Sequence, residues 1–141
     1  VVGLTQSKTV NAAWVSGATI SSGAIVVPAN SLITAFHTVV TTTFAGGGAP
    51  TVTVGTAAGG NELAVGKTIS TLAAQSIAGK GQSTNPELNT ALAAAAGNQQ
   101  LVIVAGQAYR AAETNVHFTI TAAANLTAGA AQFTVEFITF E

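Results

Sequence analysis

Alternating apolar and polar residues near the C-terminus predict two β-strands. From 116 to 121 and from 132 to 140 nearly every second residue is apolar, which places those side chains on one face of an extended chain. The first face holds Val116, Phe118 and Ile120, and the second holds Phe133, Val135 and Phe137. A loop containing Gly129 separates the two segments. This spacing predicts an antiparallel hairpin.

A second hairpin is predicted from Leu32 to Gly55. Its first strand, Leu32–Thr43, is apolar on both faces for part of its length, so we expect packing on both sides there. A glycine-rich turn over 45–50 ends it, and Thr51–Val54 then alternates cleanly. Weaker strand candidates are Asn11–Val15, Ala24–Val27, Val65–Leu72 and Leu101–Val104.

One short helix is predicted between the strands. Asn85 suits the N-cap and Pro86 the first helical position, while Leu88 and Leu92 lie one turn apart and Gly97 follows the last turn. With turn residues at short intervals elsewhere, the pattern predicts one all-β domain over 1–141. We expect an antiparallel β-sandwich of jelly-roll type with this helix inserted.

Charge is scarce in this chain. Only 6% of its 141 residues are charged, against roughly 25% in ordinary soluble domains, and aspartate is absent. A surface of Ala, Thr, Ser, Gly and Asn loses little hydration energy when a partner covers it, so we interpret the chain as one built to be buried in an assembly. The alternative is a protein that merely tolerates this composition. A net charge of −1 favours neither nucleic acid nor anionic lipid as a partner.

Membrane insertion and secretion are not predicted either. The longest apolar stretches, 23–28 and 101–105, are far shorter than the roughly 20 residues that a spanning helix needs. The N-terminal residues lack a basic region followed by an apolar stretch, so we expect no signal peptide.

The stretch from Val27 to Ala64 carries a resemblance to a known group of proteins. It combines Pro-Ala-Asn-Ser, a run ending in Val-Val-Thr-Thr-Thr-Phe, a glycine-rich turn, Pro-Thr-Val-Thr-Val-Gly and Gly-Gly-Asn-Glu-Leu. These pieces resemble small β-sandwich virion proteins of tailed bacteriophages, including capsid decoration (cement) proteins. The resemblance implies a jelly-roll-like fold, a homotrimer, and attachment to the major capsid protein on the outside of the shell. It also implies synthesis in the host cytoplasm.

Catalytic signatures are missing from the sequence. Gly66-Lys67-Thr68 looks like the end of a phosphate loop, but the glycine required five residues earlier is replaced by Asn61. No Gly-x-Ser-x-Gly is present, and a triad would lack aspartate. His37 and His117 are the histidines available to a metal-dependent enzyme, but no third ligand stands at a recognisable spacing, so ordinary strand histidines are favoured. We therefore predict no catalytic, cofactor or metal site and no enzyme.

Aromatic residues are the interface candidates. We select Trp14, Tyr109, Phe44 and Phe140, because large aromatic side chains often anchor protein interfaces. A buried Trp14 in the core is an equally good interpretation. The alternative function is a tail-fibre or adhesin module that binds host surface glycans, for which exposed aromatic rings or rows of Thr-x-Thr hydroxyls would be needed.

Overall fold

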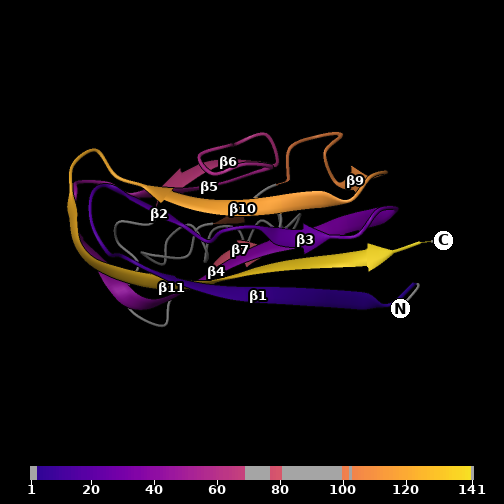
Figure 1. Cartoon of the computed structure of the whole chain (residues 1–141), viewed down its shortest axis with the longest axis horizontal. Coiled ribbons are helices and arrows are strands. Elements are labelled where there is room, and N and C mark those ends of the chain that lie inside the picture. Colours follow the sequence, from indigo (N-terminus) through magenta and orange to yellow (C-terminus); the bar gives the residue numbers. More distant parts are fainter. Residues whose placement is uncertain (1–2, 69–76, 81–99, 102, 141) are drawn as a thin grey trace, which may run out of the picture.

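The computed structural model describes residues 3–68, 77–80, 100–101 and 103–140, which form two β-sheets (Figure 1). Sheet 1 has the order β1 (Thr5–Ala13), β11 (Leu126–Thr139), β4 (Ser31–Gly46), β7 (Ile77–Lys80) and β8 (Gln100–Leu101), and β9 (Tyr109–Arg110) also pairs with β4. Sheet 2 has the order β2 (Thr19–Ser21), β10 (Thr114–Thr121), β5 (Thr51–Gly55) and β6 (Ala64–Thr68), and β3 (Ile25–Val27) also pairs with β10. Every pairing is antiparallel except that of β7 with β8.

These pairings confirm the all-β, antiparallel prediction. Strands were expected where β3, β4, β5, β10 and the second half of β11 lie, whereas β2, β7 and β9 were not foreseen. The candidate at 11–15 covers only the end of β1, which is much longer than expected. No helix occurs among the residues that the structure describes, and the helix expected over 85–97 lies outside them.

The chain crosses between the sheets at most of its connections, and this makes both predicted hairpins wrong. β10 belongs to sheet 2 and β11 to sheet 1, and β4 and β5 are separated in the same way. β4 pairs instead with β11, and β5 pairs with β10. The glycine-containing turns are therefore arches between layers. Apolar residues on both strands of such an arch face each other across the core.

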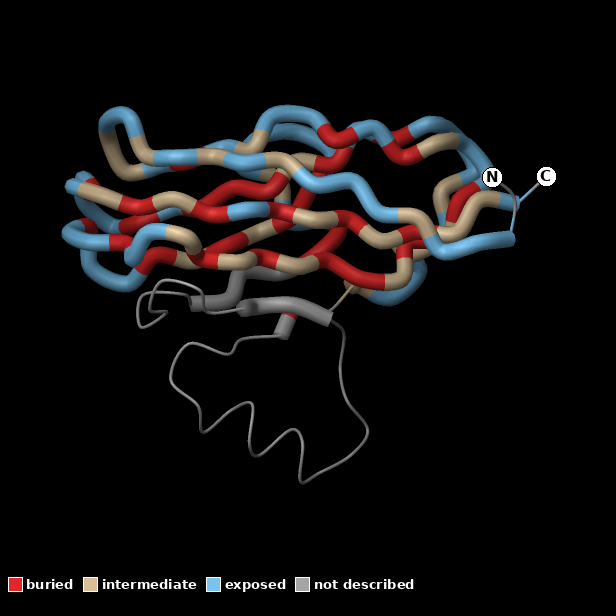
Figure 2. The backbone as a smooth tube through the Cα atoms, turned by 90° about the horizontal axis from the view of Figure 1, so that it is seen from below, coloured by how far each residue is buried: buried red, intermediate tan, exposed pale blue. Residues whose placement is uncertain are grey.

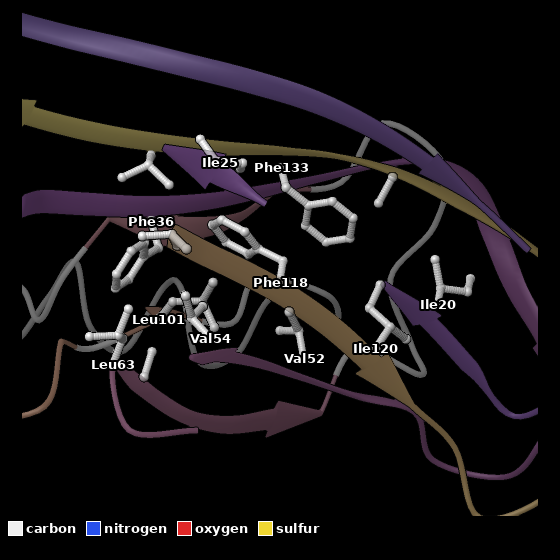
Figure 3. Close-up of a cluster of buried hydrophobic side chains, with 14 of the residues drawn as sticks. Ile20, Ile25, Phe36, Val52, Val54, Leu63, Leu101, Phe118, Ile120 and Phe133 are labelled. Atoms are coloured by element: carbon white, nitrogen blue, oxygen red, sulfur yellow. The ribbon is translucent and has the colours of Figure 1, made fainter. Parts of the chain in front are cut away.

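The core lies between the two sheets and is fully apolar at its centre. Phe118 of β10 packs edge-on against Phe36 of β4 at 5.7 Å and stacks on Phe133 of β11 at 5.0 Å, both measured between ring centroids. Figure 3 shows these rings meeting from opposite layers, with Val52 and Ile120 beside them. The alternation of buried and exposed residues along the strands (Figure 2) follows from this two-layered packing.

A bulge in β4 explains its apparently two-sided pattern. Glu136 pairs with Ala35, but Phe137 pairs with Ile33, so Thr34 is an extra residue in the register. The bulge shifts the alternation by one position, which brings both Ile33 and Phe36 into the core with at most 1% exposure. The two apolar faces in the sequence are largely one face interrupted by a bulge.

The two long sides of this layered arrangement differ. On one side the amide of Val104 donates to the carbonyl of Leu63 (2.9 Å), and Ala64 forms a bridge with Ile103, so the segment after β8 closes onto sheet 2. On the other side β1 ends sheet 1 and β3 lies at the margin of sheet 2. There the link is a side chain: Lys8 Nζ donates to the carbonyl of Val26 (2.6 Å). We call this second side the open side.

Candidate interaction surface

The charged side chains that the structure describes are mostly engaged within the chain. Lys8 extends from β1 to the β3 carbonyl and lies 5.9 Å from the centre of the Phe137 ring. Arg110 donates from Nε to Thr114 Oγ1 (3.0 Å) and from Nη1 to Gln107 Oε1 (3.1 Å). Both cations are thereby bound by groups of their own fold, although Lys8 remains exposed.

The acidic groups behave in the same way. Glu136 Oε1 lies 3.4 Å from His37 Nε2 on the outer face of sheet 1. Glu62 accepts hydrogen bonds from the hydroxyl and from the amide of Thr56, and the hydroxyl contributes most to lowering the pKa of Glu62 from 4.5 to about 2. Of the described charged side chains, Glu113 alone has no such contact within the part of the chain that the structure describes.

The β5–β6 loop shows how such a contact is built. Gly55 and Gly60 approach so closely that a Cβ on Gly55 would lie 2.5 Å from the Gly60 backbone and 2.8 Å from Glu62 Oε2. The missing side chains allow the carboxylate to reach Thr56 across the loop. The amide of Gly59 donates to Thr119 Oγ1 (2.8 Å), which fixes the loop over the outer face of sheet 2 and buries that threonine.

The four aromatic interface candidates have different environments. Phe44 is 5% exposed and belongs to the core, so it has almost no surface to offer a partner. Trp14 packs partly against the same core and donates from Nε1 to the carbonyl of Gly17 (3.0 Å). This agrees with the interpretation of Trp14 as a core residue. Tyr109 and Phe140 are 52% and 44% exposed. These two retain the surface that an interface anchor needs.

Tyr109 and Phe140 are brought together at the start of β4. Tyr109 Oη donates to Asn30 Oδ1 (3.2 Å), and the amide of Phe140 donates to the Asn30 carbonyl (2.7 Å). Leu32 pairs with Tyr109 on one side and with Ile138 on the other, so the three share one face of sheet 1. We call Tyr109, Leu32, Ile138 and Phe140 the terminal patch, because the start of β1 and the end of β11 lie at this end of the molecule (Figure 1). Sequence reasoning selected two of its members but could not place them side by side.

The two histidines do not form a site together. His37 lies on β4 beside Glu136, while His117 lies on β10 between the core residues Val116 and Phe118 and faces away from them. Since both point outward from different sheets, they lie on opposite faces of the molecule. Among residues 3–68, 77–80, 100–101 and 103–140, no group of three His, Cys, Asp or Glu side chains is placed to hold a metal ion. The joint histidine centre considered for a metal enzyme is not formed.

Hydroxyl-bearing residues do gather on sheet 2. Thr53 pairs with Thr119 and Thr51 with Thr121, while Ser21 and Thr19 of β2 continue the same two rows. The third Thr-x-Thr pair, Thr41 and Thr43, lies on β4 in sheet 1 and does not join them. The β5–β6 loop covers Thr119 and so interrupts the row from Thr53 to Ser21, whereas Thr121 in the other row is exposed.

No protein-family profile, curated protein or solved structure matches this chain significantly. In the portion of the chain that the structure describes, we find no helix with the length and apolarity required to cross a membrane.

Proposed function

We propose that this protein is a structural component of a virion, a capsid decoration protein that binds the outside of a tailed-phage head. The observation that carries the proposal is the surface chemistry: all the described charged side chains except Glu113 are bound by the protein's own groups, and small polar and apolar side chains cover the rest. Covering such a surface strips water from few charges. It therefore suits a protein buried in a lattice of contacts.

The strand order supports a jelly roll as the fold behind this function. Sheet 1 runs β1, β11, β4, β7 and sheet 2 runs β2, β10, β5, β6, so first and last strands are neighbours in each sheet and the chain folds inward from both ends. A double Greek key of eight strands gives this arrangement, and viral capsid proteins are among those that use it. The phage resemblance in 27–64 falls on β3, β4, β5 and the beginning of β6.

The terminal patch is our proposed contact with the shell. It places two exposed aromatic rings beside two half-buried aliphatic side chains. Aromatic anchors at the centre of a contact contribute most of its binding energy, and a standard contact buries roughly 1,600 Å². We propose that the protein stabilises the shell mechanically, by bridging neighbouring copies of the major capsid protein, with no catalytic step or cofactor.

Two measurements test this function. Quantitative mass spectrometry of purified particles should find a copy number comparable to that of the main shell protein; absence from particles would refute the proposal. Separately, shells lacking the protein should bind recombinant wild type, and Tyr109→Ala should weaken binding about tenfold or more. Val15→Ala is the matched control, because Val15 is 84% exposed but lies beyond the end of β1 that is farther from the terminal patch. Equal losses for both variants would place the contact elsewhere.

A glycan-binding adhesin module is the second candidate, favoured by the exposed ring of Tyr109. Jelly rolls also occur in lectins, and a sugar could stack on this ring. The same variants separate the two functions. An adhesin requires that Tyr109→Ala abolish binding to host cells while incorporation into the particle stays at the wild-type level.

A further inference from the structure

The strand β1 is nine residues long, and among the residues that the structure describes it pairs with another strand along one edge only. It ends the order of sheet 1, and β11 is its sole partner strand among the described residues (indigo in Figure 1). The amide of Trp14 donates to the carbonyl of Gly129 (2.8 Å), which shows which residues of β1 form hydrogen-bonded pairs with β11. Antiparallel pairs alternate between bonded and non-bonded, so the even-numbered residues of β1 bond to β11. The N–H and C=O groups of the odd-numbered residues point away from it.

Those odd-numbered residues are accessible. Thr5, Ser7, Thr9, Asn11 and Ala13 are all exposed. The register with β11 runs through nine successive pairs without a shift, and the strand contains no proline. Bulges, proline and charged side chains are the usual means of blocking an edge from pairing with another chain. The one charge on β1, Lys8, lies on the face of the strand that is directed toward sheet 2, where its Nζ is bound by the Val26 carbonyl.

A second copy of the chain is the partner that this edge fits. When two β1 strands align antiparallel about a two-fold axis at Thr9, Thr9 faces its counterpart, Ser7 faces Asn11 and Thr5 faces Ala13. On the other face of the strand Lys8 faces Val10 and Gln6 faces Ala12, so no like charges face each other directly in this register. An edge that is complementary to itself generates a closed two-fold interface. Within each copy the hydroxyl of Thr9 is hydrogen-bonded to that of Thr134 on the outer face of sheet 1 (2.7 Å). Pairing the two Thr9 residues would extend this row of hydroxyl groups from one copy to the other.

We propose that the protein forms a two-fold dimer in which the β1 strands of two copies pair antiparallel about Thr9 and join their sheets 1 into one. This inference does not depend on the proposed function. It differs from the trimer that the phage resemblance implies, so the mass of the oligomer distinguishes the two directly.

The first test is the oligomeric state of the full chain and its dependence on one backbone N–H. Sedimentation equilibrium should give a dimer. Thr9→Pro removes an outward N–H, costs sheet 1 no backbone hydrogen bond, and should weaken the dimer at least about tenfold. Thr9→Ala keeps the N–H and is the matched control, with dimerisation within about threefold of wild type. A wild-type monomer or trimer, or a folded Thr9→Pro variant that dimerises normally, would overturn the proposal.

The second test measures the register and does not depend on how Thr9→Pro folds. The chain has no cysteine, so an introduced one can be cross-linked without background. In the proposed dimer the two copies of residue 9 lie about 5.5 Å apart between Cα atoms, within disulfide range. The two copies of residue 11 are separated by about 14 Å. Oxidation should link Thr9→Cys into dimers and leave Asn11→Cys unlinked; the reverse result, or equal linking, would refute this pairing.

Discussion

The ring of Phe118 is the point at which the two sheets depend most directly on one another. It is fully buried and contacts Phe36 and Phe133 of the opposite layer at centroid separations of 5.7 and 5.0 Å. We expect Phe118→Ala to lower the free energy of unfolding by about 4 kcal/mol, within the range of 3–5 kcal/mol typical of buried Phe→Ala changes. That is a large part of the roughly 5–15 kcal/mol by which a domain is stable.

Urea unfolding followed by the fluorescence of Trp14, the single tryptophan, measures this loss. Phe140→Ala is the control, because Phe140 lies past the end of β11 and is 44% exposed. Its cost should stay within about 0.5 kcal/mol. A double-mutant cycle between Phe118 and Phe133 should give a coupling of about 1 kcal/mol for the stacked pair. A loss below about 1 kcal/mol for Phe118→Ala would refute the packing of the two sheets through these rings.

Two further predictions concern a glycine and a carboxylate. Gly129 has a φ of +148°, and a Cβ there would lie 2.2 Å from the ring of Phe44, so Gly129→Ala should destabilise by about 3 kcal/mol. In a Phe44→Ala background the same change should cost clearly less, and equal costs would contradict the clash. The pKa of Glu62 is lowered to about 2, so its stabilising effect is complete above pH 4.5 and is lost as the pH falls toward 2. After discounting for solvent exposure, Glu62→Gln should cost about 1 kcal/mol at pH 7 and almost nothing at pH 2 in urea unfolding. A difference that does not change with pH would exclude this role of the carboxylate.

Local sequence patterns predicted where the strands lie better than they predicted which strands pair with each other. The alternation around Phe118 and Phe133 correctly assigned each side chain to a buried face, because that property depends only on residues two positions apart. The partner of each strand depends on packing across the core, and both predicted hairpins failed for that reason. β2 and β9 are too short for a periodic signal.

The candidate surface was only partly accessible to sequence reasoning. Aromatic residue type alone selected Phe44 together with Tyr109, yet one is in the core and the other is half exposed. A signal for Phe44 existed in Gly129, whose missing side chain leaves room for the ring, but these residues are far apart in the chain. Glu62 went unnoticed as a loop anchor, although the surrounding glycines were visible.

By itself the sequence determined the all-β character of the described residues and the scarcity of charge, because period-two alternation and composition are properties of the chain before it folds. Tertiary structure alone decided which strands meet, how the bulge at Thr34 brings Ile33 and Phe36 to one face, and that β1 has a single partner strand among the described residues. These features arise from contacts between residues far apart in the chain. Their free energy comes from fitting two layers around a shared core, which no local pattern contains.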